Sequence, residues 1–476
     1  MRHLLQILCT AALLLAATTA SMAAEAVKPN VLLIMSDDLN CDLGCYGHKL
    51  VQSPNIDRLA ARGIRFERAY CQYPVCNPSR SSCMTGLYPE RTTVLDNARR
   101  FRAELPEVVT LPQFFRQQGY FVARVGKIYH YGVPNEIGTD GLDDPASWEQ
   151  VVNPRGIDRE SHDKILSIQD NDSFGGTLSW LNIESTDEEH TDGIAATEAI
   201  KLLEAHRDGP FFLAVGFYRP HTPYVAPPHH FEKYPREKIE PVLEKPGDRD
   251  DIPRAAIFDR PGQRELSLEK RKEIIQAYYA AISRMDAQVG RLLDALERLK
   301  LNENTIIVFV SDHGYHLGAH GMWQKSDLFE ESVRVPMVIV DPRAKAAGST
   351  AAVSEMVDIY PTLTELCGFT PPEHLAGVSL APVLRDPTSA GKESALSVTV
   401  VRNRIPEAGS GRVLGHTIRT PRYRYTEWGD GRLGAELYDY ETDPEEYTNL
   451  FGKPEAAEVE AELKRLLGRA RERSRK

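Results

Sequence analysis

The chain has 476 residues, of which 42% are hydrophobic and 26% are charged, and its formal net charge is −11. These fractions are typical of a globular protein, and the length suits one large domain with a smaller one. The negative charge argues against general binding to nucleic acids or to anionic membranes. The basic groups of any anion-binding site must therefore be local.

The first two dozen residues have the pattern of a secretory signal. Arg2 and His3 precede an apolar run over residues 4–17, and small residues at 21–24 offer a cleavage site. The apolar run is short for a transmembrane helix, and no later run reaches spanning length. We therefore expect a signal peptide over 1–24 and an exported protein, periplasmic or extracellular. A single N-glycosylation sequon, at Asn171, favours a bacterial source.

Four apolar runs rich in β-branched residues predict buried strands, over 30–35, 120–125, 211–217 and 305–310. Each run ends in polar residues, which are Asp37 and Asp38, Lys127 and His130, Arg219 and His221, and Asp312 and His313. Helical patterns lie between the strands, from Pro54 to Gly63 and over 194–206 and 271–299. This alternation predicts a layered α/β domain, where ligands bind beyond the carboxyl ends of the strands. We expect one composite active site there.

Two segments, 141–190 and 224–266, have no clear periodicity and predict irregular insertions that line a substrate pocket. After residue 386 the pattern changes to short strand-like runs over 395–402, 415–420, 422–428 and 436–440, then a charged helix from 454 to about 473. We expect a catalytic domain over 25–386 and a C-terminal subdomain over 387–476, with a small antiparallel sheet and a terminal helix.

The stretch from Cys76 to Arg80 places a reactive side chain just before a predicted helix. Asn77 suits the N-cap, Pro78 the first helical position, and Gly86 the residue after the last turn. Cys76 would then face the positive end of the helix, and Arg80 would add a bidentate clamp for a tetrahedral oxyanion. A buried cysteine before an ordinary capped helix would have the same local pattern.

Asp37, Asp38, Asp312 and His313 are candidate metal ligands. Adjacent carboxylates repel one another unless a cation or a basic group lies between them. Capping of the turn after a strand is the alternative for the first pair, but a second aspartate at another strand end favours a shared cation. Oxygen ligands without a thiolate cage favour Ca²⁺ or Mg²⁺.

The string Cys76-x-Pro78-Ser79-Arg80, with Thr85-Gly86 following, resembles the sulfatase motif. Within that family the chain is most similar to the iduronate 2-sulfatase group, in Val31 to Ile34, Asp37 to Leu39, Leu43 to Gly47, Ser53 to Asp57, Phe211 to Gly216, Ile418 to Thr420 and Tyr423 to Thr426. The resemblance covers nearly the whole mature chain. It implies sulfuric ester hydrolysis on the alkaline-phosphatase-like fold, a large mixed sheet flanked by helices with a small C-terminal domain.

The resemblance also implies a set of site residues. A separate maturase would oxidise Cys76 to formylglycine, whose hydrate is the nucleophile. Asp37, Asp38, Asp312, His313 and the converted Cys76 would hold a Ca²⁺. The cationic side of the site would consist of Arg80, Lys127, His130, His221 and Lys325. Arg80 and Lys127 would hold oxygens, His221 or Lys325 would protonate the leaving alcohol, and His130 would regenerate the aldehyde.

The resemblance predicts the reaction at the sulfate group more firmly than it predicts which sugar carries that sulfate. Tyr315-His316 stands where animal-type iduronate 2-sulfatases tend to have Trp-Ala, and Ala319 replaces a frequent Glu. The candidate substrate-binding residues are Tyr315, His316, His229 and Arg422, with His230 and Arg424 beside them. We expect an exo-acting 2-O-sulfatase on uronate-bearing oligosaccharides such as glycosaminoglycans. The alternatives are an arylsulfatase, a phosphonate or phosphate monoester hydrolase of the same superfamily, and a binding protein without turnover.

Overall fold

The computed structural model describes residues 28–169, 173–344, 346–402, 405–406, 409 and 411–476. The predicted signal peptide lies outside these residues, and so does Asn171. Among the helices of the described ranges, none combines the length and the apolar character needed to cross a membrane.

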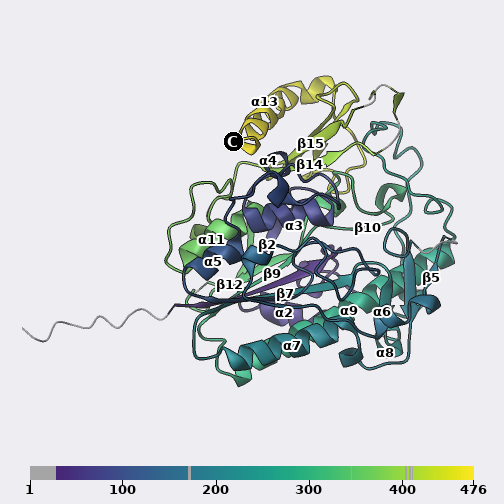
Figure 1. Cartoon of the computed structure of the whole chain (residues 1–476). Helices are drawn as coiled ribbons and strands as arrows, with labels where there is room; N and C mark the ends of the chain where they lie inside the picture. Colours follow the sequence, from purple (N-terminus) through teal and green to yellow (C-terminus); the bar gives the residue numbers. More distant parts are fainter. Residues whose placement is uncertain (1–27, 170–172, 345, 403–404, 407–408, 410) are drawn as a thin grey trace, which may run out of the picture.

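An eight-stranded mixed sheet forms the centre of the large domain (Figure 1). Its spatial order is β13 (Gly348–Glu355), β2 (Ile64–Tyr70), β12 (Met337–Val340), β9 (Thr305–Ser311), β1 (Asn30–Asp37), β7 (Phe211–Pro220), β3 (Phe121–Gly126) and β4 (Gln150–Val152). Strand β12 is antiparallel to both neighbours, whereas the other pairs are parallel. The four predicted strands are neighbours in the order β9-β1-β7-β3, so their carboxyl ends meet.

Helices cover both faces of this sheet (Figure 1). Helices α3 (Cys76–Thr85), α5 (Leu111–Gln117) and α11 (Ile359–Leu366) pack on the face that receives Val31 and Leu33 of β1. Helices α2 (Pro54–Ala60), α7 (Thr191–Ala205) and α9 (Leu268–Arg298) pack on the face that receives Leu32 and Ile34. Because both faces are covered, β1 is buried throughout, which explains its continuous apolar run.

The predicted C-terminal sheet is confirmed. Strands β14 (Ala395–Val400), β15 (Leu414–Arg419), β16 (Tyr423–Trp428) and β17 (Ala435–Asp439) form an antiparallel sheet in that order. Helix α13 (Ala457–Ser474) covers one face, with Leu463, Leu466 and Leu467 in a core shared with Ile418 and Leu437. The helix α12 (Ala381–Arg385) ends just before the expected domain boundary at residue 386, which itself stays a prediction.

The two segments expected to be irregular contain short elements that pair with each other. Strands β5 (Leu166–Ser167) and β6 (Ser179–Asn182) come from the first segment, and β6 pairs in parallel with β8 (Tyr224–Ala226) of the second. Short helices α6 (Ile157–Glu160) and α8 (Pro228–Phe231) lie in the same two segments. Sequence reasoning missed this sheet because each of its strands is too short to show periodicity.

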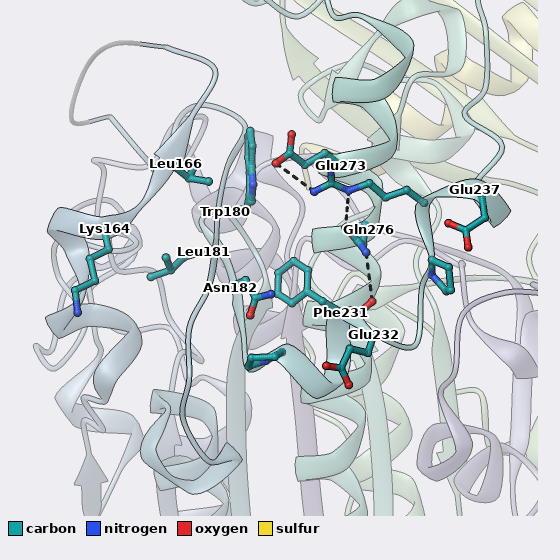
Figure 2. A pocket seen from close by; sticks show the side chains of 13 residues that line it. Lys164, Leu166, Trp180, Leu181, Asn182, Phe231, Glu232, Glu237, Glu273 and Gln276 are labelled. Atoms are coloured by element: carbon teal, nitrogen blue, oxygen red, sulfur yellow. Dashed lines mark hydrogen bonds and ion pairs between the residues drawn. The ribbon is translucent and has the colours of Figure 1, made fainter.

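A pocket of about 770 Å³ lies beside this small sheet (Figure 2). Trp180 of β6, Phe231 of α8 and Gln276 of α9 line it, and Glu273 pairs there with Arg236 at 3.3 Å. None of its lining residues is a predicted site residue. Other short elements include α4 (Pro89–Thr92), α10 (Glu330–Val333) and the hairpin of β10 (His316–Leu317) and β11 (Trp323–Gln324).

Candidate active site

The polar residues at the four strand ends come together as the topology requires. Asp37 ends β1, Lys127 follows β3, His221 follows β7 and Asp312 follows β9, and all four side chains are buried. Asp38 adopts a left-handed backbone with φ 65°, and its N–H donates to Asp312 Oδ1 at 3.1 Å. The backbone turn after β1 thus ties the two acidic segments to each other.

Cys76 lies at the first residue of α3, which differs from the predicted helix start. Val75 occupies the N-cap and provides no side-chain cap, whereas Asn77 donates from Nδ2 to the carbonyls of Asp96 and Arg99 at 2.9 and 2.7 Å. The predicted N-cap at Asn77 is therefore wrong, because tertiary contacts use its amide. Gly86 does end the helix with φ 70°, as expected.

The Cys76 thiol is surrounded by charged groups although its side chain is fully buried. Its Sγ lies 3.4 Å from His313 Nε2, 3.3 Å from Lys325 Nζ and 4.0 Å from Asp38 Oδ1. Lys325 Nζ also pairs with Asp38 Oδ1. Burial and the carboxylate of Asp37 raise the pKa of Cys76 well above its usual range, so the unmodified side chain is a neutral thiol and a poor nucleophile.

Arg80 pairs with two of the predicted metal ligands. Its Nε donates to Asp312 Oδ2 at 2.9 Å, and its Nη2 to Asp37 Oδ1 at 3.1 Å. Its Nη1 donates to the carbonyls of Lys127 and Ile128. Arg80 therefore positions carboxylates and the segment after β3 in this structure, whereas its predicted contact with a substrate oxyanion stays a prediction.

Burial and opposing charges determine the protonation of these groups. Burial by itself would raise the pKa of Asp37, but Lys127 Nζ at 2.6 Å and Arg80 hold it well below its usual range. Burial and nearby lysines lower the pKa of His130 and of His221 well below the usual range, so both imidazoles are neutral. The His221 Nδ1 lies 2.6 Å from the carbonyl of Thr222 and carries the proton, which leaves Nε2 toward Asp38 at 3.9 Å.

The acidic side chains fit a divalent cation. Asp37, Cys76, Asp312 and His313 each offer a ligand atom within 4.8 Å of one another, and so do Asp37, Asp38, Cys76 and His221. Asp38 Oδ2 is buried and has no hydrogen-bond partner among the residues that the structure describes, which is costly for a carboxylate oxygen unless a cation satisfies it. A hard cation with oxygen ligands suits this donor set. The second grouping adds His221, which was not among the predicted metal ligands.

Two predicted substrate-binding residues lie deep beside the cluster. The hydroxyl of Tyr315 is 2.6 Å from that of Tyr224, and its ring stacks on Tyr278 at 5.2 Å. His316 pairs through Nε2 with Asp327 at 3.0 Å and is fully buried. These contacts hold the loop after β9 in place, and a role for either side chain in sugar binding stays a prediction.

The other predicted substrate-binding residues already have carboxylate neighbours. His229 lies 3.7 Å from Asp187, which also pairs with His230, and Arg422 pairs with Asp439 and Glu441. Arg424 is buried and pairs with Glu446. Within the described ranges, no hydrogen bond or ion pair joins these residues to the cluster around Cys76, so their predicted role is not yet supported by contacts.

Sequence reasoning missed Arg260, which reaches the site from the 224–266 segment. Its Nη2 lies 3.5 Å from the carbonyl of Lys325 and 3.4 Å from Ser326 Oγ. The segment around it has no periodic pattern and no motif, so nothing in the sequence distinguishes Arg260 from a surface arginine.

Comparison with known proteins decides the family. The sulfatase family profile matches residues 29–369, and the profile of the C-terminal part of N-sulphoglucosamine sulphohydrolases matches residues 318–473. The chain belongs to the sulfatase family. This sulfatase is 32% identical to human (Homo sapiens) iduronate 2-sulfatase, over 90% of this chain and 92% of the relative. It is 33% identical to a sulfatase of Formosa agariphila, over 89% of this chain and 83% of the relative.

Solved structures agree with the fold. The phosphonate monoester hydrolase of Agrobacterium radiobacter superposes with a TM-score of 0.76 at 25% identity, and the match covers 94% of this sulfatase and 96% of that chain. The predicted alkaline-phosphatase-like fold and the predicted sulfuric ester hydrolase activity are confirmed at the level of the family.

Proposed function

We propose that this sulfatase is exported and removes 2-O-sulfate from uronic acid residues of sulfated oligosaccharides. We further propose that it uses a formylglycine made from Cys76 and a bound Ca²⁺. The observation that carries the proposal is the position of Cys76, buried at the start of α3 among carboxylates and within 3.3 Å of Lys325 Nζ. A neutral thiol at this point has no obvious structural use, whereas an oxygen nucleophile beside cationic groups suits attack on a sulfate ester.

The acidic residues of the site would bind the cation in such a reaction. Asp37, Asp38, Asp312 and His313 would hold the cation, which supplies positive charge to the sulfate oxygens and to the converted side chain. Lys127 Nζ and Arg80 hold Asp37 in place.

Proton transfer would fall to Lys325, His221 and His130. Lys325 Nζ lies beside Asp38 with a proton and would donate it to the leaving alcohol, whereas His221 Nε2, also beside Asp38, would have to gain a proton before it could act as the donor. His130 is buried, neutral and has an Nδ1 without a partner among the described residues, so it has the state required of a base.

The 2-O-sulfated uronate is supported by similarity to iduronate 2-sulfatases over most of the chain. The test compares turnover of a 2-sulfated uronate disaccharide with that of 6-sulfated hexosamine and sulfated galactose. We expect the uronate substrate to have the highest kcat/KM. A clear preference for either neutral sugar would refute the uronate assignment and leave the sulfatase activity standing.

Nucleophile and metal are tested on the same preparation. Mass spectrometry of the peptide that contains Cys76 is expected to show formylglycine, and Cys76→Ala is expected to fold and lose turnover. Removing metal with a chelator is expected to lower both turnover and the thermal midpoint, with Ca²⁺ restoring both. Recovery of only unmodified cysteine from fully active enzyme would contradict the formylglycine nucleophile. Undiminished turnover after metal removal would contradict the requirement for a bound metal.

A second candidate activity is hydrolysis of phosphonate or phosphate monoesters. The observation that favours it is the similarity to the phosphonate monoester hydrolase of Agrobacterium radiobacter. A cationic site with a metal also suits phosphoryl groups. Turnover of an aryl phosphonate or aryl phosphate faster than that of an aryl sulfate would favour this second activity.

A further inference from the structure

The guanidinium of Arg260 joins the loop that contains Gly176 to the segment that carries Lys325. Its Nη1 donates to the carbonyl of Gly176 at 3.1 Å, and its Nη2 approaches the carbonyl of Lys325 and the hydroxyl of Ser326. Gly175 packs against His221, because a Cβ on Gly175 would lie 3.7 Å from His221 Cε1. Arg260 is therefore held near both predicted proton donors by backbone and hydroxyl groups, and no hydrogen bond joins it to the His221 imidazole or the Lys325 ammonium among the described residues.

Among the described residues, Arg260 forms no direct ion pair, and the carboxylates of Asp38 and Asp327 act on it only from a distance. Across the ranges that the structure describes, no carboxylate oxygen lies within ion-pair distance of its guanidinium, and its Nε is buried without a hydrogen-bond partner. The hydrogen bonds of this guanidinium all go to neutral carbonyls or a hydroxyl. A half-buried cation held by neutral groups is costly, and an anionic ligand would relieve that cost.

A second arginine lies near the same aromatic ring as Arg260. The ring of Phe258 has the Arg260 guanidinium carbon 5.1 Å from its centroid and that of Arg402 at 5.7 Å. Cation–π contact of this kind positions a guanidinium without neutralising it. Phe258 and Arg402 line a pocket of about 340 Å³ that also contains Arg412. Arg412 pairs with Asp96 at 2.7 Å, whereas Arg402 has no carboxylate partner in the described part of the chain.

We propose that Arg260 and Arg402 form a carboxylate subsite beside the sulfate position, which binds the carboxylate of the uronic acid that carries the sulfate. This inference rests on the proposed function and adds the residues that select the sugar. The planar fork of a guanidinium matches a carboxylate with two parallel hydrogen bonds. A neutral sugar would leave Arg260 unpaired and would be rejected for that reason. The predicted residues Arg422 and Arg424 are less suited, because protein carboxylates already pair with both.

The test uses Arg260→Gln with three substrates, which are a 2-sulfated uronate disaccharide, its carboxyl methyl ester and 4-nitrophenyl sulfate. We expect the variant to lose between about 10-fold and about 100-fold in kcat/KM on the disaccharide, and to retain the aryl sulfate activity within about 3-fold. The wild-type protein should be less active on the methyl ester than on the free disaccharide by a similar factor. Arg260→Gln should be equally active on the methyl ester and on the free disaccharide.

Arg264→Gln is the matched control. Arg264 belongs to the same segment but is half-exposed and pairs with Glu244, so its replacement should leave all three substrates unchanged. Arg402→Gln is the second variant, used if Arg260→Gln fails to fold. It alters an exposed side chain and should show the same selective loss of activity on the disaccharide, but a smaller one. An equal loss on the disaccharide and the aryl sulfate, or no loss on the disaccharide, would overturn the subsite.

A separate measurement keeps the subsite apart from the proposed substrate. An unsulfated uronic acid disaccharide is tested as an inhibitor of 4-nitrophenyl sulfate turnover. This assay reports binding of the uronate and does not require that the enzyme hydrolyse a sulfated uronate. The subsite predicts inhibition of the wild-type protein that weakens at least about 10-fold in Arg260→Gln. Absence of inhibition overturns the subsite, whereas inhibition without turnover of the sulfated disaccharide refutes only the proposed 2-O-sulfatase activity.

Discussion

Replacing Arg80 by lysine keeps one positive charge in the site but removes the planar fork. The Arg80 guanidinium is fully buried and donates to Asp312, Asp37 and the carbonyls of Lys127 and Ile128. A lysine ammonium is a single nitrogen on a flexible stem, and it cannot reach acceptors that surround a guanidinium on three sides. We expect Arg80→Lys to leave at least two of these buried acceptors without a donor.

The magnitude follows from the cost of an unsatisfied buried group. Each such acceptor costs about 1–3 kcal/mol, so the free energy of unfolding should fall by about 2–6 kcal/mol. Turnover should fall by about 100-fold even at temperatures where the variant is folded, because Asp37 and Asp312 lose their fixed positions.

The free energy of unfolding of the wild-type protein and of Arg80→Lys is measured by urea unfolding followed by tryptophan fluorescence, in the presence of Ca²⁺ and again with a chelator. The matched control is Arg58→Lys, since Arg58 is 38% exposed and forms a surface ion pair with Asp294, itself 66% exposed. That control should change the free energy of unfolding by no more than about 0.5 kcal/mol. A loss below about 1 kcal/mol in Arg80→Lys would refute the argument that the guanidinium fork organises the site.

Three further predictions concern other groups. Lys325→Ala and His221→Ala identify the proton donor. The variant that lacks the donor should lose at least about 100-fold in turnover of a sugar sulfate and less than about 10-fold in turnover of 4-nitrophenyl sulfate, because the nitrophenolate leaves without a proton. Equal losses on both substrates in both variants would contradict this. Burial raises the folded-state pKa of Asp286 to about 6, so its stability contribution is present at low pH and is lost as pH rises through 6. Wild-type stability relative to Asp286→Asn should therefore fall by about 2 kcal/mol between pH 4 and pH 7, and a constant difference over that range would contradict this. Lys392→Met should lower the free energy of unfolding by about 3–5 kcal/mol, because Lys392 pairs with two buried carboxylates, and a loss below about 1 kcal/mol in urea unfolding would argue against it.

The strand ends could be predicted from the sequence because burial and chemistry change at the same residues. The run before Asp37 is apolar on both faces, and the polar residues begin where the sheet ends. The same change occurs before Lys127, His221 and Asp312, so parallel neighbours were enough to place these side chains together.

Contacts that depend on side-chain reach could not be predicted in this way. The amide of Asn77 has the local pattern of a helix cap, yet it donates to carbonyls 19 and 22 residues along the chain. Arg260 lies in a segment without periodicity, and its approach to Lys325 depends on how two insertions fold over the sheet. The helix α2 shows the same effect, because Asp286 of α9 accepts from the N–H groups of Asn55 and Ile56 and caps the helix from outside.

The complete burial of α3 limits when Cys76 can be chemically changed. All ten residues of the helix are buried, and the thiol has no exposed surface. If Cys76 is converted as we propose, the converting enzyme would have to reach a side chain that the folded protein buries completely. Conversion would then have to precede folding of the large domain, and a chain that folds first would keep its thiol. The active fraction of a preparation should then depend on the relative rates of synthesis, conversion and folding, so slower synthesis or a higher concentration of the converting enzyme should raise specific activity without changing the fold.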